Sequence, residues 1–99
     1  MQNKEEKYLE EIRGIIARNL HPKRIWLFGS RSKGTQKYNS DFDIAYEGGN
    51  ASFRRKRKTQ EEASEKAGIY SVDIVELEDT SDDFQNLVRE EGKIIYERD

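Results

Sequence analysis

The sequence predicts a small α/β (α+β) domain in which helices pack on one mixed β-sheet. Segments with helical periodicity alternate with short apolar or alternating segments that are typical of strands. Glycine, proline and capping residues separate these segments. A chain of 99 residues, of which 33% are hydrophobic, suits a single domain over residues 1–99 with a thin core.

The first segment predicts a helix over residues 4–19, because apolar residues recur there at helical spacing with charges between them. Its apolar positions are Tyr8, Leu9, Ile12, Ile15 and Ile16. The helix should end before Pro22, since a residue that precedes proline avoids helical backbone angles.

Four segments predict the strands of the sheet. Residues 25–28 (IWLF) are wholly apolar, as in a strand that is buried on both faces, so Trp26 is expected in the core. Residues 41–46 (DFDIAY) and 72–77 (VDIVEL) alternate apolar and acidic positions. Residues 93–96 (KIIY) could add a last strand at the end of the chain.

The segments between these strands predict three more helices. Each has a side chain that can cap its start, and the two longer ones end at a glycine. The segments are 30–38, capped by Ser30 and continuing into a loop, 51–67 between Asn50 and Gly68, and 82–91 between Ser81 and Gly92.

The helix predicted over residues 51–67 has an unusual charge pattern. Its few apolar positions are Phe53, Ala63 and Ala67, so it should be only weakly amphipathic. Five consecutive cations fill residues 54–58, and three glutamates follow within the same helix. Such a run is most often a solvated face, and docking of a partner or contact with RNA is the alternative.

Composition excludes several classes of protein. Lys plus Arg number 18 and Asp plus Glu 20, a net charge of −2, which argues against a wholly basic nucleic-acid binder. The absence of cysteine excludes disulfides, zinc–thiolate sites and cysteine nucleophiles, and it suits the cytoplasm. With no apolar run near the ~18 residues that span a bilayer, we expect a cytoplasmic protein with no membrane segment. A partner chain or a second copy could cover part of so lean a domain.

Three aspartates lie inside predicted strands, where aspartate is disfavoured. Asp41 and Asp43 are two positions apart and so project from one face, and Asp73 follows the same alternation on a later strand. If the two strands are neighbours, the three carboxylates converge, since cross-strand Cβ atoms lie about 5 Å apart. Such crowding needs a cation, and dense oxygen ligands suit Mg²⁺, with two ions as in two-metal sites. Alternatively, the pair on the first strand is an edge-strand charge that discourages aggregation.

A second motif ends the first predicted strand. Gly29 allows a tight turn and close approach of the backbone to a ligand, and Ser30 supplies a hydroxyl at the start of a helix. Free N–H groups and the positive end of the helix dipole favour a phosphate at such a position. Arg31 lies in the same turn. Taken alone, the Gly-Ser pair is more often a simple turn and helix cap.

Together these motifs resemble a known family. Gly29-Ser30-Arg31-x-x-Gly34, then residues 40–45 (SDFDIA) and 72–75 (VDIV), resemble the minimal nucleotidyltransferases of the DNA polymerase β superfamily, in particular the small stand-alone bacterial or archaeal members. The resemblance covers residues 25–77 and implies the polymerase β palm-like fold.

The resemblance also implies roles for individual residues. Asp41 and Asp43 would hold both Mg²⁺ ions, and Asp73 would bind the catalytic ion and help to deprotonate an acceptor hydroxyl. Gly29 and Ser30 would bind the β- and γ-phosphates of a nucleoside triphosphate, usually ATP. A role in neutralising the triphosphate would fall to Arg31.

Small members of this family are commonly encoded with a separate HEPN-type or substrate-binding helical protein. The resemblance therefore implies an antitoxin that transfers AMP from ATP to a tyrosine of a toxin partner, with the acceptor platform supplied by another chain. One alternative keeps the chemistry but uses a small molecule or an RNA end as acceptor. Another is a module that binds and masks a toxin without catalysis.

Overall fold

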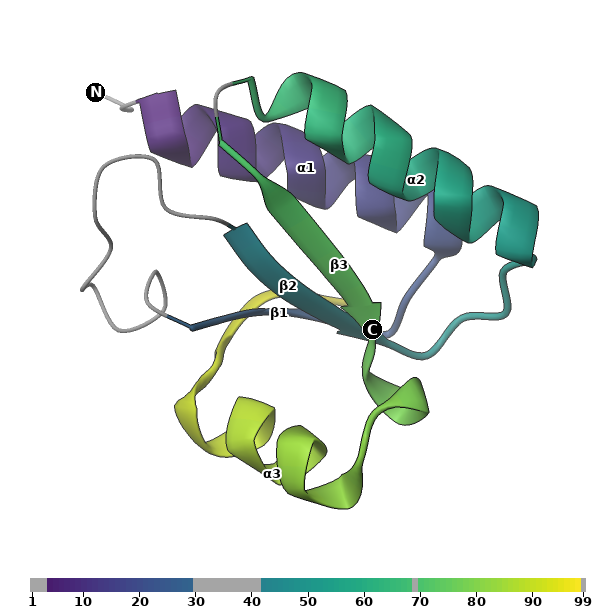
Figure 1. The fold of residues 1–99 in the computed structure, drawn as a ribbon, viewed down its shortest axis with the longest axis vertical. Helices are drawn as coiled ribbons and strands as arrows, with labels where there is room; N and C mark the ends of the chain where they lie inside the picture. Colours follow the sequence, from purple (N-terminus) through teal and green to yellow (C-terminus); the bar gives the residue numbers. More distant parts are fainter. Residues whose placement is uncertain (1–3, 30–41, 69, 99) are drawn as a thin grey trace.

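The computed structural model describes residues 4–29, 42–68 and 70–98. In this part of the chain three helices, four strands and one 3₁₀ turn follow one another (Figure 1). They are α1 (Lys4–Leu20), β1 (Arg24–Phe28), β2 (Phe42–Glu47), α2 (Phe53–Lys66), β3 (Val72–Glu76), η1 (Leu77–Asp79), α3 (Asp82–Glu91) and β4 (Lys93–Glu97). The helix predicted over residues 30–38 lies outside the described residues.

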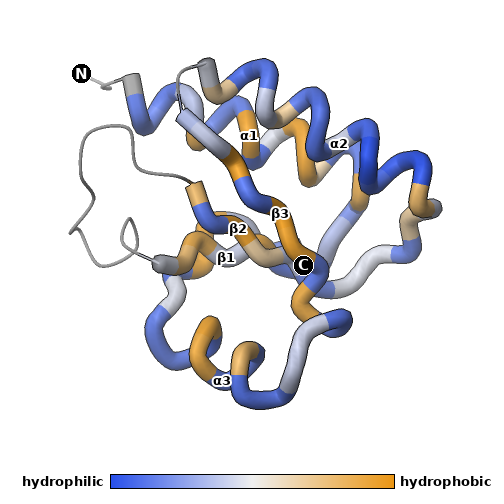
Figure 2. Tube along the Cα trace, in the orientation of Figure 1, coloured by the Kyte–Doolittle hydropathy of each residue, from blue (hydrophilic) through white to orange (hydrophobic). Residues whose placement is uncertain are grey.

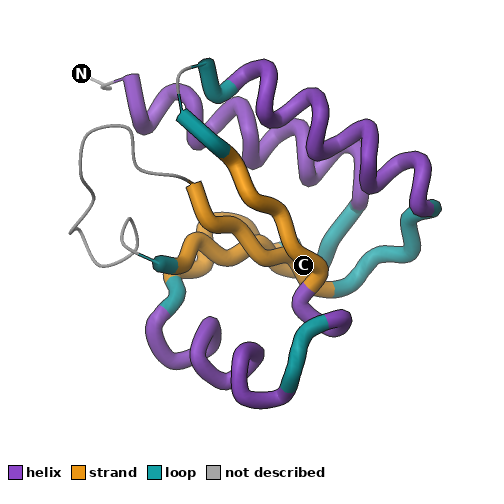
Figure 3. Tube along the Cα trace, in the orientation of Figure 1, coloured by secondary structure: helices purple, strands orange, loops and turns teal. Residues whose placement is uncertain are grey.

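The four strands form one mixed sheet in the order β3-β2-β1-β4. β1 pairs antiparallel with both β2 and β4, whereas β2 and β3 are parallel and are joined through α2. α1 and α2 lie on one face of the sheet and run in opposite directions, and α3 lies on the other face (Figure 3). The predicted fold class, a small mixed sheet with helices packed on it, is confirmed.

Each face of the sheet has its own hydrophobic core. Successive side chains along a strand point to opposite faces, so one strand contributes residues to both cores. On β1, Ile25 and Leu27 join the larger cluster under α1 and α2, while Trp26 joins the smaller cluster under α3. The central position of β1 therefore explains why its sequence is apolar without alternation. Figure 2 shows the resulting pattern, with hydrophobic strands between helices that carry hydrophilic outer faces.

The start of α2 differs from the prediction in two respects. Ser52, not Asn50, is the N-cap, and its hydroxyl oxygen accepts a hydrogen bond from the backbone N–H of Arg55 at 3.2 Å. Phe53, expected on the inner face, is 81% exposed. The inner face of α2 instead consists of small side chains, because α2 packs directly against α1. These buried residues are Thr59 and Ala63, and Ala67, the C-cap of α2, is buried as well.

The elements at the end of the chain follow the prediction closely. Ser81 caps α3, with its hydroxyl oxygen accepting from the N–H of Phe84 at 3.2 Å, and Gly92 ends that helix. The third strand ends one residue earlier than expected, at Glu76. Leu77 begins η1 instead and buries its side chain in the smaller cluster under α3.

Candidate active site

Two of the predicted carboxylates meet at the start of the parallel strand pair. Asp43 on β2 is the direct register partner of Asp73 on β3. Neighbouring strands are about 4.8 Å apart, so residues in register on one face are in close reach of each other. Asp73 is exposed and Asp43 is half-buried. Asp41, the third predicted carboxylate, lies outside the described residues.

The residues on either side of Asp43 and Asp73 along the strands show which face of the sheet carries these carboxylates. Phe42 and Ile44 on β2, and Val72 and Ile74 on β3, face the larger cluster under α1 and α2. Strand alternation therefore points the side chains of Asp43 and Asp73 to the face that α3 covers.

The apolar cover on that face ends just before the carboxylates. Ala45 and Val75, the next residues of the same parity on β2 and β3, belong to the cluster under α3. One residue pair further toward the start of the strands, the acidic side chains replace apolar ones. The acidic side chains at this end of the sheet thus lie next to the apolar side chains that α3 covers.

Gly29 brings the end of β1 to the same place. β1 and β2 are antiparallel with Phe28 opposite Asp43, so the turn after β1 passes beside the start of β2. Gly29 has φ +78°, and a Cβ at this position would lie 2.6 Å from Oδ2 of Asp43. From its sequence context, Gly29 was expected only to bind phosphate. The structure adds a second need for glycine, the close approach of a carboxylate from another strand. No local signal could have revealed that approach, because it depends on strand pairing.

The remaining predicted site residues, Ser30 and Arg31, lie outside the described residues. Within residues 4–29, 42–68 and 70–98, no group of three His, Cys, Asp or Glu side chains is placed to hold a metal ion. The adjacent pair Asp43 and Asp73 nevertheless has the donor chemistry that suits a hard divalent cation, since two like charges in register need a compensating positive charge.

A separate polar cluster lies at the far end of β2, centred on Glu47. Glu47 is 9% exposed and accepts hydrogen bonds from Trp26 Nε1 at 3.0 Å, Arg24 Nη1 at 3.1 Å and Arg89 Nη2 at 3.3 Å. Burial by itself raises the pKa of Glu47, but the hydrogen bonds from Trp26 and Arg24 and the charges of both arginines outweigh it and lower the pKa below its ordinary value. Trp26 is thus a core residue, as predicted, and this cluster stabilises the fold away from Asp43.

Two cations of the basic run on α2 form ion pairs. Lys56 Nζ lies 2.8 Å from Glu76 Oε1, and Arg57 Nε lies 3.5 Å from Glu61 Oε1. The prediction of a solvated face holds for Arg57 and its partner, which are both largely exposed.

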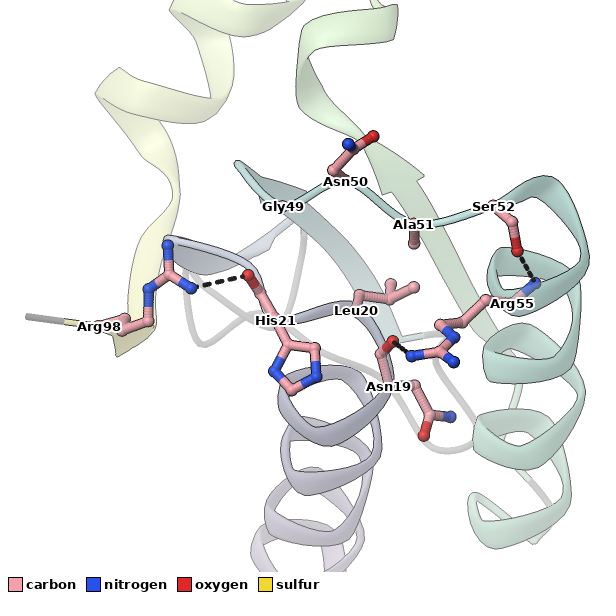
Figure 4. Close-up of a pocket in the computed structure, with 9 residues that line it drawn as sticks. All are labelled: Asn19, Leu20, His21, Gly49, Asn50, Ala51, Ser52, Arg55 and Arg98. Atoms are coloured by element: carbon pink, nitrogen blue, oxygen red, sulfur yellow. Dashed lines mark hydrogen bonds between the residues drawn. The ribbon is translucent and has the colours of Figure 1, made fainter.

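An open cavity of about 530 Å³ lies at the end of the molecule away from the carboxylates (Figure 4). Arg55 and Arg98 line it, and their guanidinium groups donate to the backbone carbonyls of Asn19 and His21 at 3.5 Å and 3.2 Å. Both arginines therefore satisfy carbonyls at the C-terminal end of α1. Of the predicted site residues that the structure describes, Gly29, Asp43 and Asp73, none lines this cavity.

No helix in the described ranges has the length and apolar character needed to cross a membrane.

Comparison with known proteins shows the family of this chain. Residues 10–99 match the family model of the polymerase beta nucleotidyltransferase domain. The chain is 33% identical over 76 residues to the probable protein adenylyltransferase MntA of Haemophilus influenzae, a match that covers 76% of this chain and 67% of the relative.

Solved structures show the same fold. A toxin–antitoxin structure with AMP-PNP superposes with a TM-score of 0.77 and 28% identity, covering 90% of this chain and 73% of that one. The Shewanella oneidensis complex of a tri-AMPylated HEPN toxin with an MNT antitoxin superposes with a TM-score of 0.72 and 22% identity, covering 93% and 71%. The family match includes the strands that carry Asp43 and Asp73, and this chain therefore belongs to the polymerase β nucleotidyltransferase family, as a minimal nucleotidyltransferase.

Proposed function

We propose that this nucleotidyltransferase transfers AMP from ATP to the hydroxyl of a tyrosine on a HEPN-type partner protein, and so acts as the antitoxin of a toxin–antitoxin pair. The observation that carries the proposal is the register of β2 and β3, which sets Asp43 beside Asp73 and next to Gly29. The adenylyltransferase relative and the toxin–antitoxin structure with AMP-PNP, an ATP analogue, support the same substrate and partner. The reaction belongs in the cytoplasm, where ATP is available.

Asp41, Asp43 and Asp73 are the residues that we expect to hold two Mg²⁺ ions. Their carboxylate oxygens are the ligands that Mg²⁺ takes up together with substrate phosphates. When bound, the metal neutralises phosphate charge and makes the attacking oxygen more acidic. Family resemblance supports Asp41 as the third ligand, since it precedes Asp43 by two residues in the sequence.

Asp73 has the placement that a proton acceptor needs. Its side chain is exposed at the edge of the sheet, where a hydroxyl presented by another protein can reach it. In the proposed step the hydroxyl oxygen attacks the α-phosphorus of ATP and forms the new P–O bond. The bond from the α-phosphorus to the bridging oxygen breaks, pyrophosphate leaves, and the hydroxyl proton passes to the Asp73 carboxylate.

Gly29, Ser30 and Arg31 are expected to bind the triphosphate. The turn at Gly29 lies beside Asp43, so phosphates held there would be within reach of the carboxylates. Positioning and electrostatic stabilisation supply most of the rate in reactions of this kind. Ser30 is expected to contribute its hydroxyl, and Arg31 its positive charge, to the phosphates.

The test is a transfer assay with Mg²⁺, ATP labelled in the α-phosphate and the HEPN-type protein encoded beside this chain. Wild-type protein should label the partner on a tyrosine. Asp43→Asn should lower transfer by at least about 10²–10³-fold, the loss typical when one preorganised group is removed from an active site. The fold should be unchanged, because the substitution replaces only one carboxylate oxygen by an NH₂ group. Asp79→Asn, which neutralises an exposed aspartate outside the proposed site, is the control and should transfer normally.

Other outcomes would favour the alternatives. Label on RNA or on a small molecule would replace the protein acceptor. A tight complex with the partner that forms equally well with Asp43→Asn, with no label transferred by either protein, would indicate a module that only binds its toxin.

A further inference from the structure

The outer edge of β3 is closed by one side chain of α2. β3 is an edge strand, and the outward N–H and C=O groups of such a strand are usually unpaired. Gln60 Nε2 donates to the carbonyl oxygen of Val72 at 2.7 Å, and Gln60 Oε1 accepts from the N–H of Ile74 at 3.2 Å. One side-chain amide thus replaces the peptide group that a fifth strand would offer.

The two backbone groups that Gln60 binds are those on either side of Asp73. On its inner edge β3 pairs with β2, where Asp73 is in register with Asp43. The strand segment that carries Asp73 is therefore held from both edges, by a strand on one side and by Gln60 on the other.

A second contact keeps α2 aligned with β3. Lys56 Nζ lies 2.8 Å from Glu76 Oε1, one helical turn before Gln60. Four helical residues advance about 6 Å, and two strand residues about 6.6 Å, so helix positions four apart match strand positions two apart. Lys56 meets Glu76 and Gln60 meets Ile74, which shows that α2 runs antiparallel to β3, as Figure 1 also shows.

We propose that Gln60 is a positioning residue for Asp73. The inference rests on the proposed function, in which Asp73 holds a metal ion and accepts a proton. Asp73 is exposed, so its side chain has little packing around it, and its placement depends on the backbone of β3. Outer contacts that orient a metal ligand typically change metal affinity or activity about 10–100-fold when they are removed.

Gln60→Met tests the proposal, because methionine keeps the length of the side chain and removes both hydrogen bonds. We expect the kcat for AMP transfer to the partner to fall about 10-fold or more, with the KM for ATP within about twofold, because the triphosphate binds on the β1 side. The affinity for Mn²⁺ alone, measured by electron paramagnetic resonance, should fall, as it should in Asp73→Asn. The N–H of Ile74 should exchange faster with solvent.

Two matched variants separate positioning from general stability. Gln85 Nε2 donates to the carbonyl of Thr80 at 3.0 Å, so Gln85→Met removes a similar bond on α3, away from Asp73. Ser64→Ala removes the 3.0 Å bond between Ser64 Oγ and Gln60 Nε2 but keeps both bonds from Gln60 to β3. Both variants should keep the wild-type kcat and Mn²⁺ affinity.

Three outcomes decide the matter. Loss of kcat and Mn²⁺ affinity in Gln60→Met, but not in Gln85→Met, supports the proposal. Wild-type kcat and Mn²⁺ affinity in Gln60→Met, with faster exchange at Ile74, would show that the amide only stabilises the strand and would overturn it. If the wild-type protein transfers no AMP, the proposed function is wrong. The positioning role is then tested by whether Gln60→Met lowers the Mn²⁺ affinity as Asp73→Asn does. Should the methionine variant melt below the assay temperature, Gln60→Ala gives the same comparison.

Discussion

Replacement of Gly29 by alanine should damage the proposed active site more than it damages the fold. The added Cβ would lie 2.6 Å from Oδ2 and 3.4 Å from Cγ of Asp43. An ordinary contact between these atoms needs about 3.4 Å, so the Asp43 carboxylate must move by roughly 0.8 Å. The backbone at residue 29 also keeps φ near +78°, a region that a Cβ disfavours.

The positive φ should mainly lower stability, whereas the displaced Asp43 carboxylate should mainly lower activity. A residue with a Cβ in the left-handed region costs about 1–2 kcal/mol in the free energy of unfolding. A displacement of about 1 Å in a reacting group can lower the rate 10²-fold. We therefore expect Gly29→Ala to lose about 1–2 kcal/mol of stability and about 10²-fold in AMP transfer.

Gly68→Ala is the matched control, since Gly68 also has a positive φ, +67°, but a Cβ there would meet Tyr8 Oη and Cζ at ordinary distances of 3.5 Å and 3.7 Å. Urea unfolding should give similar losses of stability for the two variants, whereas the transfer assay should show a large loss for Gly29→Ala alone. Full activity in Gly29→Ala, or an equal loss in Gly68→Ala, would refute the argument that Gly29 makes room for the carboxylate.

Two further predictions concern the fold. Glu47→Gln should destabilise by about 0.5–2 kcal/mol at neutral pH, since it weakens two ion pairs, with the half-exposed Arg24 and Arg89. Because folding lowers the pKa of Glu47, this advantage is present above the unfolded pKa near 4.5 and is lost as the pH falls through the lower folded pKa. Urea unfolding from pH 7 down to pH 3 should show the gap between the two proteins closing; a constant gap would contradict it. Ser52→Ala should cost about 1 kcal/mol by the same assay and Asn50→Ala little, and the reverse order would contradict the observed cap.

Local patterns were sufficient to predict most of the fold. The stripe of isoleucines on α1, the apolar run of β1 and the cap and stop of α3 are encoded within a few neighbouring residues, and the structure confirms all three. The start of α2 was harder to predict. Asn50 and Ser52 are both good caps, so local sequence does not choose between them. Gly49, directly before Asn50, lies against the backbone carbonyls of Leu20 and His21 at the end of α1, a contact that no local pattern contains.

In the candidate site, too, some features follow from local sequence and others only from strand pairing. Alternation alone predicted that Asp43 and Asp73 each project from one face of their strands, and that conclusion needs only the two-residue period of a strand. Whether they face each other depends on strand order and register, which no local pattern contains.

The sequence by itself determined the elements, the sidedness of the strands and the resemblance to a nucleotidyltransferase, because these depend on residue type and spacing along the chain. Only the tertiary structure decided that Asp43 and Asp73 are register partners, that Gly29 leaves room for a carboxylate, and that Gln60 closes the strand edge beside Asp73. The physical reason is that contacts between residues 12 to 30 positions apart arise from the pairing of strands and the alignment of a helix with a sheet edge.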